Sequence, residues 1–397
     1  MATAPEPAGV TPTPGRTDPV SRARAIAEIV AAAAPRIEAG KALTPDVLDA
    51  LHGARLFRTL LPRAYDGEQV TPATFFRMQE VVAAADGSTG WCLCQASGCS
   101  FAAAYMAPEA AGDIWGDPRA VVAWGFGNGT AQVVPGGYRV TGTWSFASGN
   151  RHATWMGGHC RVREADGSIR MTAGGVPVER TMMVRRDVPR FHDVWDVVGL
   201  RGTNSDTYTI EGVFVPEEYS VCRDSDAERR IHAPLYRFAT SHLYAAGFAG
   251  VSLGIARGLL DAFVDLAKAE TAAARPVRDS EVVQSGIARS EAKLRSARAW
   301  LTEVLDEAHE VAATTGRITA HERAMVRLAT TSAIHRAKEV AEWAYHEAGA
   351  GAIMPSGPFE RRMRDIHASA QQVHGRTAHL GMCGRHFLGM NPSGRFF

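Results

Sequence analysis

The spacing of apolar residues along the chain first indicates helices. From Ser21 to Asp117 apolar positions recur every three or four residues, as in the run from Ala25 to Ala33, which is the period of a helix with one buried face. Helix-breaking sequences occur at Leu61-Pro62 and Asp66-Gly67. We therefore expect an N-terminal helical domain over residues 21–117, with about four helices.

The pattern then changes to short runs rich in β-branched and aromatic residues. AVVAWGF, YRVTGTWSF, TMMVRR and DTYTIEGVFVP are examples, and runs of this kind are typical of strands. Pro135-Gly136-Gly137 and Asp166-Gly167 have the composition of hairpin turns. These features predict a small β-barrel domain over residues 118–233.

Helical spacing returns over residues 234–397. We expect four long helices here, forming a bundle over residues 239–271, 280–316, 319–349 and 360–390. Gly247, Gly250, Gly254 and Gly258 recur near one face of the first helix, where the lack of side chains lets another helix approach closely. Residues 1–20 contain five prolines and are expected to form a disordered arm.

Composition excludes several classes of partner. The 43 basic and 42 acidic residues give a formal net charge of +1, so no excess positive charge favours nucleic acid or an anionic membrane. Six cysteines in 397 residues are too few for a disulfide framework and fit reduced thiols. The start of the chain lacks the apolar stretch of a signal peptide, and the uncharged stretch from Gly87 to Pro108 is expected to be buried, not to span a membrane. A cytoplasmic protein is predicted.

Three stretches carry a resemblance to a known family. Residues 138–149 (YRVTGTWSFASG), residues 199–216 (GLRGTNSDTYTIEGVFVP) and the pair Arg364-Asp365 resemble motifs of the acyl-CoA dehydrogenase superfamily. The resemblance implies an α+β protein with the acyl-CoA dehydrogenase fold: an N-terminal helical domain, a central small β-barrel and a C-terminal four-helix bundle. It also implies a homotetramer.

One departure from the dehydrogenase pattern changes the expected chemistry. Val373 and His374 stand where the dehydrogenases have the glutamate that removes the substrate's α-proton. A histidine near this place resembles the two-component flavin-dependent monooxygenases of the superfamily, of the p-hydroxyphenylacetate hydroxylase and dibenzothiophene monooxygenase type. That branch implies reduced flavin (FMNH2 or FADH2) from a separate NAD(P)H-flavin reductase, O2, a C4a-hydroperoxyflavin, and hydroxylation of a small aromatic or polyketide-like substrate.

The resemblance also implies roles for individual residues. His374 and Ser148 are the candidate catalytic residues, with His374 either as a base or as a hydrogen-bond donor to the oxygenating group. A turn serine and a helix histidine of purely structural role are the alternatives. Candidate flavin contacts are Trp124, Gly125, Phe146, Ser148, Arg201 and Arg275, with Trp144 as a further apolar wall.

Trp91, Gln95 and His367 are the candidate substrate-pocket residues. Trp91 and Gln95 are four residues apart and so share a helix face, and His367 lies seven residues before His374, close to the same face if one helix carries both. The spacing of the C-terminal histidines does not favour a metal site. Oxygenation at nitrogen or sulfur, a true acyl-CoA dehydrogenase using FAD, and a scaffold without flavin remain as alternative functions.

Overall fold

The computed structural model describes residues 17–269 and 276–392. Helix α1 begins at Pro19, where the Asp18 carboxylate accepts hydrogen bonds from the backbone N–H groups of Val20 and Ser21, the usual cap of a helix start. The predicted boundary of the N-terminal arm at residue 20 is therefore late by two residues, and residues 1–16 of that arm lie outside the described residues.

The N-terminal domain has one more α-helix than predicted. Its helices are α1 (Pro19–Gly40), α2 (Pro45–Gly53), α3 (Pro72–Ala85), α4 (Gly87–Ser100) and α5 (Pro108–Trp115). The uncharged stretch that begins at Gly87 forms α4 and a 3-10 turn, and nearly all of it is buried. The Asp86 side chain caps α4 by accepting from the backbone N–H of Thr89 at 2.8 Å.

The middle of the chain forms one curved sheet that encloses its own core. Its strands are β1 (Val122–Trp124), β2 (Phe126–Gly127), β3 (Gly129–Val134), β4 (Gly137–Ala147), β5 (Trp155–Arg163), β6 (Glu179–Arg185), β7 (Arg190–His192), β8 (Asp206–Pro216) and β9 (Ser220–Val221). The order is β7-β8-β4-β3-β5-β6-β9, with β1 beside β5 and β2 beside β4. The turn predicted at Pro135-Gly136 connects β3 to β4, and Gly136 has a φ of +80° there.

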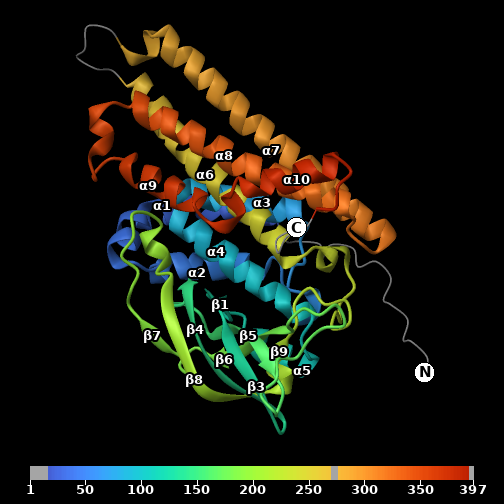
Figure 1. Cartoon of the computed structure of the whole chain (residues 1–397). Helices are drawn as coiled ribbons and strands as arrows, with labels where there is room; N and C mark the ends of the chain where they lie inside the picture. The colour runs from blue at the N-terminus through green and yellow to red at the C-terminus, as the bar shows by residue number, and fades with distance from the viewer. Residues whose placement is uncertain (1–16, 270–275, 393–397) are drawn as a thin grey trace.

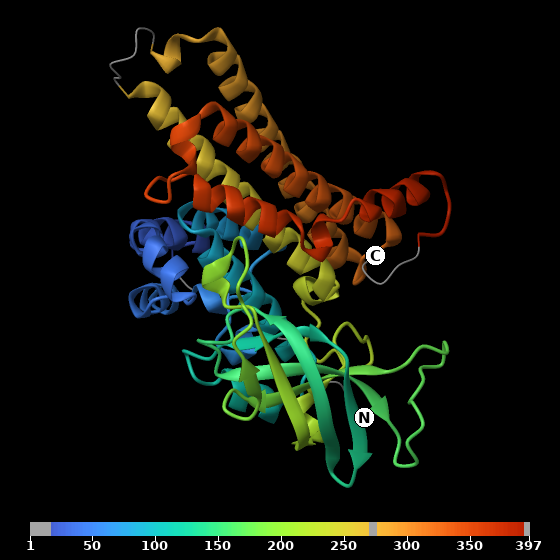
Figure 2. The same ribbon diagram turned by 60° about the vertical axis from the view of Figure 1, so that its left-hand side comes forward.

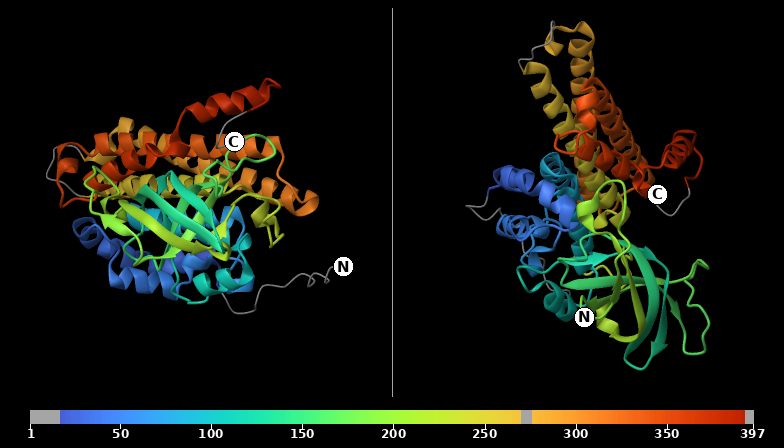
Figure 3. Two further views of the ribbon diagram at one scale, coloured as in Figure 1. Left: turned by 60° about the horizontal axis from the view of Figure 1, so that its bottom comes forward. Right: turned by 90° about the vertical axis from the view of Figure 1, so that its left-hand side faces the viewer.

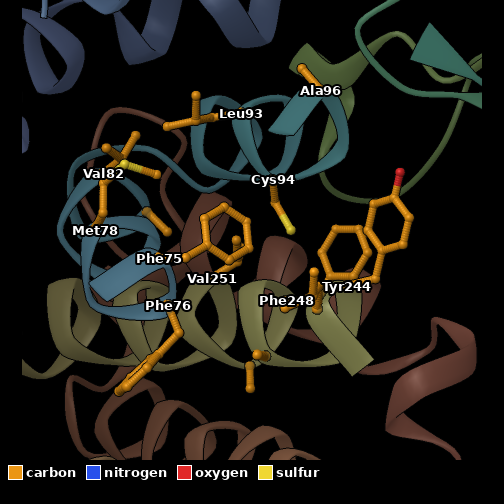
Figure 4. Close-up of a cluster of buried hydrophobic side chains, with 14 of the residues drawn as sticks. Phe75, Phe76, Met78, Val82, Leu93, Cys94, Ala96, Tyr244, Phe248 and Val251 are labelled. Carbon is orange, nitrogen blue, oxygen red and sulfur yellow. The ribbon is translucent and has the colours of Figure 1, made fainter. Parts of the chain in front are cut away.

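The C-terminal region is built on three long helices. They are α6 (Thr240–Lys268), α7 (Glu281–Thr315) and α8 (Ala320–Glu347). The four glycines of α6 face α3, as the spacing predicted: a Cβ on Gly250 would lie 2.4 Å from the backbone oxygen of Phe76, and one on Gly254 would lie 2.3 Å from that of Glu80. Figure 4 shows the aromatic and aliphatic side chains of α3, α4 and α6 that fill this contact.

The predicted single helix over residues 360–390 is wrong. Helix α9 (Glu360–Ala370) stops, a 3-10 turn follows at Val373–Gly375, and α10 (Ala378–Phe387) runs separately. The chain folds back at Gly375, where a Cβ would lie 2.4 Å from the oxygen of Ala370. His374 is therefore on a tight turn and does not share a helix face with His367.

The elements form three layers. The C-terminal helices lie at one end of the molecule, the sheet lies at the other, and the N-terminal helices pack against both (Figures 1 and 3). Figure 2 shows the curvature of the sheet and α10 projecting to one side. Within the described part of the chain, α6 alone is long and apolar enough to cross a membrane, and 89% of its most apolar window is buried inside the protein.

Candidate functional site

A bulge at the end of β4 leaves Phe146 exposed and Ser148 buried. The register between β4 and β8 shifts between Trp144 and Ala147, and Phe146 takes a φ of +61°. Its side chain is 62% exposed, whereas Ser148 is buried. Positive φ in a bulky residue is costly and tends to occur at functional sites. Trp144 instead lies in the core of the sheet, stacked on Tyr208, so the prediction that it lines the flavin site is wrong.

A chain of hydrogen bonds leads away from the Ser148 hydroxyl. The indole N–H of Trp91, on α4, donates to Ser148 Oγ at 3.0 Å. Ser148 Oγ lies 2.6 Å from Ser205 Oγ, which lies 2.7 Å from Thr203 Oγ1. Thr203 Oγ1 donates to the backbone oxygen of Leu200 at 2.8 Å. The three hydroxyl side chains are all buried, and the chain connects α4 with the ends of β4 and β8.

An aromatic row connects Trp91 with His374. The centres of the Trp91 ring and the Phe248 ring on α6 are 4.1 Å apart. The centre of the Phe248 ring lies 6.1 Å from that of the His374 imidazole and 5.7 Å from that of the Tyr244 ring. Figure 4 shows Tyr244 and Phe248 side by side on α6. Both predicted catalytic residues are thus part of one continuous group of side chains, with Ser148 at one end and His374 at the other.

His374 is held from several directions. The backbone N–H of His374 donates to Gln372 Oε1 at 2.8 Å, and the backbone oxygen of His374 accepts from Thr331 Oγ1 at 3.2 Å. Its Nδ1 lies 2.8 Å from Nη1 of Arg327 on α8. Because a guanidinium only donates hydrogen bonds, Nδ1 is the acceptor and a neutral His374 carries its proton on Nε2.

The electrostatic environment of the His374 side chain keeps the imidazole neutral. The imidazole is buried, and burial lowers its pKa well below the usual range because it disfavours the charged form. The positive charge of Arg327 and the neighbouring imidazoles of His379 and His242 lower the pKa further. At neutral pH the side chain is therefore a hydrogen-bond donor through Nε2 and a poor proton acceptor.

Gln95, Trp124 and Gly125 lie beside this group. Gln95 Nε2 donates to the backbone oxygen of Trp124 at 3.4 Å, and the N–H of Gly125 donates to the Tyr208 hydroxyl at 3.3 Å. The Trp124 indole packs against Arg223, whose Cζ lies 4.6 Å from its centre. The structure thus brings Gln95, a predicted pocket residue, to the backbone of Trp124, a predicted flavin contact.

The other predicted site residues lie elsewhere. The Arg201 guanidinium donates to the backbone oxygen of Val197 at 2.8 Å and lies 3.7 Å from the Glu38 carboxylate. Because it has these partners within the chain, it is not positioned for two parallel hydrogen bonds to a flavin phosphate. His367 lies 3.5 Å from the Glu342 carboxylate and faces a separate cavity of about 640 Å³. Arg275 lies outside the described residues.

Sequence reasoning missed several residues of the site. Ser205 and Thr203 are in a stretch noted only for its family resemblance, and Phe248 is between glycines that were explained by helix packing. Arg327 had a detectable signal, since it sits among Ala324, Thr330 and Thr331 on a face of α8 that is otherwise small and buried. A fully buried arginine on such a face usually has a specific partner.

Phe146 and Ser148 supply an exposed apolar ring and a hydroxyl close together along the chain. The exposed Phe146 ring meets Trp195 edge to face at 6.0 Å, and the Ser148 hydroxyl lies two residues along the chain from this aromatic surface. An isoalloxazine ring has this combination of an apolar face and a polar edge at N5. Within residues 17–269 and 276–392, no three His, Cys, Asp or Glu side chains gather as a metal site would require.

The chain is similar to known flavin-dependent enzymes. Residues 246–376 match the family described as acyl-CoA dehydrogenase, C-terminal domain. The chain is 29% identical to indole-3-acetate monooxygenase of Pseudomonas putida, with 88% of each chain covered. It is 28% identical to the flavin-dependent monooxygenase, oxygenase subunit HsaA, of Rhodococcus jostii, covering 83% of this chain and 86% of that protein. The crystal structure of 3-HSA hydroxylase from Rhodococcus matches with a TM-score of 0.88 and 25% identity, over 96% of this chain and 99% of that one.

Proposed function

We propose that this chain is a member of the flavin-dependent monooxygenase branch of the acyl-CoA dehydrogenase superfamily, and that it is the oxygenase component of a two-component system. It takes reduced flavin from a separate NAD(P)H-flavin reductase, and its substrate is a small aromatic molecule. The name of the Rhodococcus relative, an oxygenase subunit, supports a reductase partner. We further propose a homotetramer that works in the cytoplasm.

The observation that carries this proposal is the state of His374. A dehydrogenase needs a base at this position to remove an α-proton, and a base must accept a proton near neutral pH. His374 has Nδ1 engaged by Arg327, and its pKa is well below the usual range because it is buried. It is therefore suited to donate a hydrogen bond from Nε2 and not to abstract a proton from carbon.

The remaining residues have roles in binding and in excluding water. Reduced flavin supplies the electrons that activate O2. Phe146 would provide an apolar surface for its ring, and Ser148 would lie at N5. Trp91, Phe248 and Tyr244 form a mostly buried aromatic wall, which keeps water from the reacting atoms.

A rapid-mixing experiment tests the proposal. The purified protein is mixed anaerobically with FMNH2 or FADH2, oxygen is admitted in a stopped-flow spectrometer, and near-ultraviolet absorbance is followed. We expect a long-lived species whose spectrum differs from those of reduced and oxidised flavin. Direct reoxidation without such a species, together with tightly held oxidised FAD that an acyl-CoA bleaches, would show a dehydrogenase instead.

A further inference from the structure

The hydrogen-bond chain that begins at Ser148 has only one consistent direction. The Leu200 oxygen can only accept, so the single hydroxyl proton of Thr203 is used there. Thr203 Oγ1 must then accept from Ser205, which uses the only hydroxyl proton of Ser205. Ser205 Oγ must in turn accept from Ser148.

Ser148 is consequently left as an acceptor. Its own proton is directed toward Ser205, and one of its two lone pairs accepts from the Trp91 indole N–H. The second lone pair is the hydrogen-bonding capacity that Ser148 retains for any other group. The sequence predicted Ser148 as a flavin contact, and the direction of the chain makes it the acceptor in such a contact.

We propose that the chain Trp91–Ser148–Ser205–Thr203 sets the redox selectivity of the flavin site by fixing Ser148 as a hydrogen-bond acceptor for flavin N5–H. In reduced flavin N5 carries a hydrogen and can donate to Ser148. In oxidised flavin N5 is a bare nitrogen with a lone pair, which would face the lone pair of Ser148. This inference rests on the proposed function, because it places the flavin ring beside Ser148.

The arrangement suits an enzyme that receives its flavin already reduced. A buried acceptor that meets a donor forms a hydrogen bond, whereas two buried acceptors facing each other leave both unsatisfied. Two opposed acceptors cost more free energy than one hydrogen bond gains. The hydrogen-bond chain therefore discriminates mainly by weakening the binding of oxidised flavin. Ser205 and Thr203 act in this as positioning residues, since they reach the flavin only through Ser148.

Substitution of Thr203 tests the direction of the hydrogen-bond chain. In Thr203→Val, which has nearly the same shape, Ser205 loses its acceptor and can turn to donate to Ser148. The Ser148 proton is then free to donate to oxidised N5. The Leu200 oxygen still accepts from Trp195 Nε1 at 3.2 Å, so this variant leaves no backbone group without a partner. Thr203→Ser is the matched control because it keeps the hydroxyl.

The measurement is the dissociation constant of each flavin state. FMN and FAD, oxidised in air and reduced under anaerobic conditions, are titrated into each protein and followed by quenching of tryptophan fluorescence. We expect the unmodified protein to bind the reduced form at least about tenfold more tightly. Thr203→Val should narrow this ratio about tenfold, chiefly by tighter binding of oxidised flavin, and Thr203→Ser should retain the ratio.

The outcomes separate this inference from the proposed function. An equal affinity of the unmodified protein for both states, or a ratio that Thr203→Val leaves unchanged, overturns the inference while flavin binding stands. A protein that binds neither state of either flavin overturns the proposed function, and the inference with it. Ser148→Ala should weaken binding of the reduced form and should improve binding of the oxidised form less than Thr203→Val does, because it removes the opposing lone pair but supplies no donor to N5. This difference distinguishes a change of direction from the simple loss of a hydroxyl.

Discussion

Replacing His374 with glutamine should change how the stability of the protein depends on pH. The folded protein keeps His374 neutral, because burial and the nearby charge of Arg327 lower its pKa well below the usual range. In the unfolded chain a histidine titrates near pH 6.5. A glutamine has no such titration, and its amide oxygen can accept from Arg327 as Nδ1 does. His374→Gln therefore removes one titrating group while keeping a partner for the guanidinium.

The sign and size of the effect follow from proton binding. Below pH 6.5 the unfolded chain binds a proton at His374 that the folded protein does not, so the free energy of unfolding falls as the pH falls. Between pH 7.5 and 5.5 this single histidine lowers the free energy of unfolding by about 1.4 kcal/mol. The loss in His374→Gln over the same interval should be smaller by that amount.

Asp365 provides a control of opposite sign. Burial, together with the nearby Asp86 carboxylate, raises its pKa to about 7, so in this interval the folded protein takes up a proton that the unfolded chain does not. This uptake stabilises the folded protein by about 2 kcal/mol as the pH falls from 7.5 to 5.5. Asp365→Asn, whose side-chain oxygen can still accept from the N–H of Leu200 as the carboxylate does at 2.6 Å, should lose that contribution.

Urea unfolding at pH 7.5, 6.5 and 5.5, at one protein concentration, measures both effects. As the pH falls from 7.5 to 5.5, we expect the free energy of unfolding to become less favourable to the folded state in Asp365→Asn than in the unmodified protein, and more favourable to it in His374→Gln. Equal pH dependence in the unmodified protein and His374→Gln would show that His374 takes up a proton as readily in the folded protein as in the unfolded chain, and the reasoning about its role would be wrong.

Two further predictions concern packing and catalysis. Gly250→Ala should destabilise the protein by about 1–3 kcal/mol, because the added Cβ would lie 2.4 Å from the backbone oxygen of Phe76. Gly112→Ala is the control: the space around Gly112 is open, so this change should stabilise the protein by up to about 1 kcal/mol. The melting temperatures of the two variants measure the difference. His374→Ala should lower the product formed per O2 consumed and raise peroxide release, with reduced-flavin affinity nearly unchanged. His367→Ala is the control expected to leave product yield intact, and an unchanged yield in His374→Ala would reject its catalytic role.

The sequence was sufficient for the features that depend on local pattern. Strand ranges followed from runs such as residues 138–146, and α4 was recognised as buried from its lack of charge. The close approach of another helix to α6 followed from the glycine spacing that includes Gly250, although the spacing did not identify that helix as α3. In each case the relevant interaction is encoded by residues close together along the chain, and the family resemblance supplied the order of the domains.

The features that sequence reasoning missed depend on distant contacts. The C-terminal pattern predicts one helix, but the turn at His374 is held by residues some forty positions earlier. Thr331 Oγ1 and His335 Nε2 donate hydrogen bonds to the backbone oxygens of His374 and Gly375 at 3.2 and 2.9 Å. Helical spacing contains no information about such partners. For Arg327, the small residues around it indicate a buried position that needs a partner, but the identity of that partner depends on where the turn places the imidazole of His374.

The protonation states around the aromatic row lead to a last prediction, on the pH dependence of oxygen transfer. Burial raises the pKa of the Cys94 thiol and the Tyr244 hydroxyl well above their usual ranges, and that of Cys99 to about 12, so each keeps its proton. His374 stays neutral because its pKa is lowered. None of these groups changes charge between pH 6.5 and 9.

Oxygen transfer to a substrate that need not lose a proton, such as an indole, should therefore proceed with a rate that is flat across this interval. A phenol that must ionise in the site should instead react faster as the pH rises toward its own pKa. Single-turnover rates measured from pH 6.5 to 9 with one substrate of each kind distinguish the two cases. A bell-shaped profile shared by both substrates would require a side chain that titrates near neutrality, and would overturn the assignment of His374 as a donor.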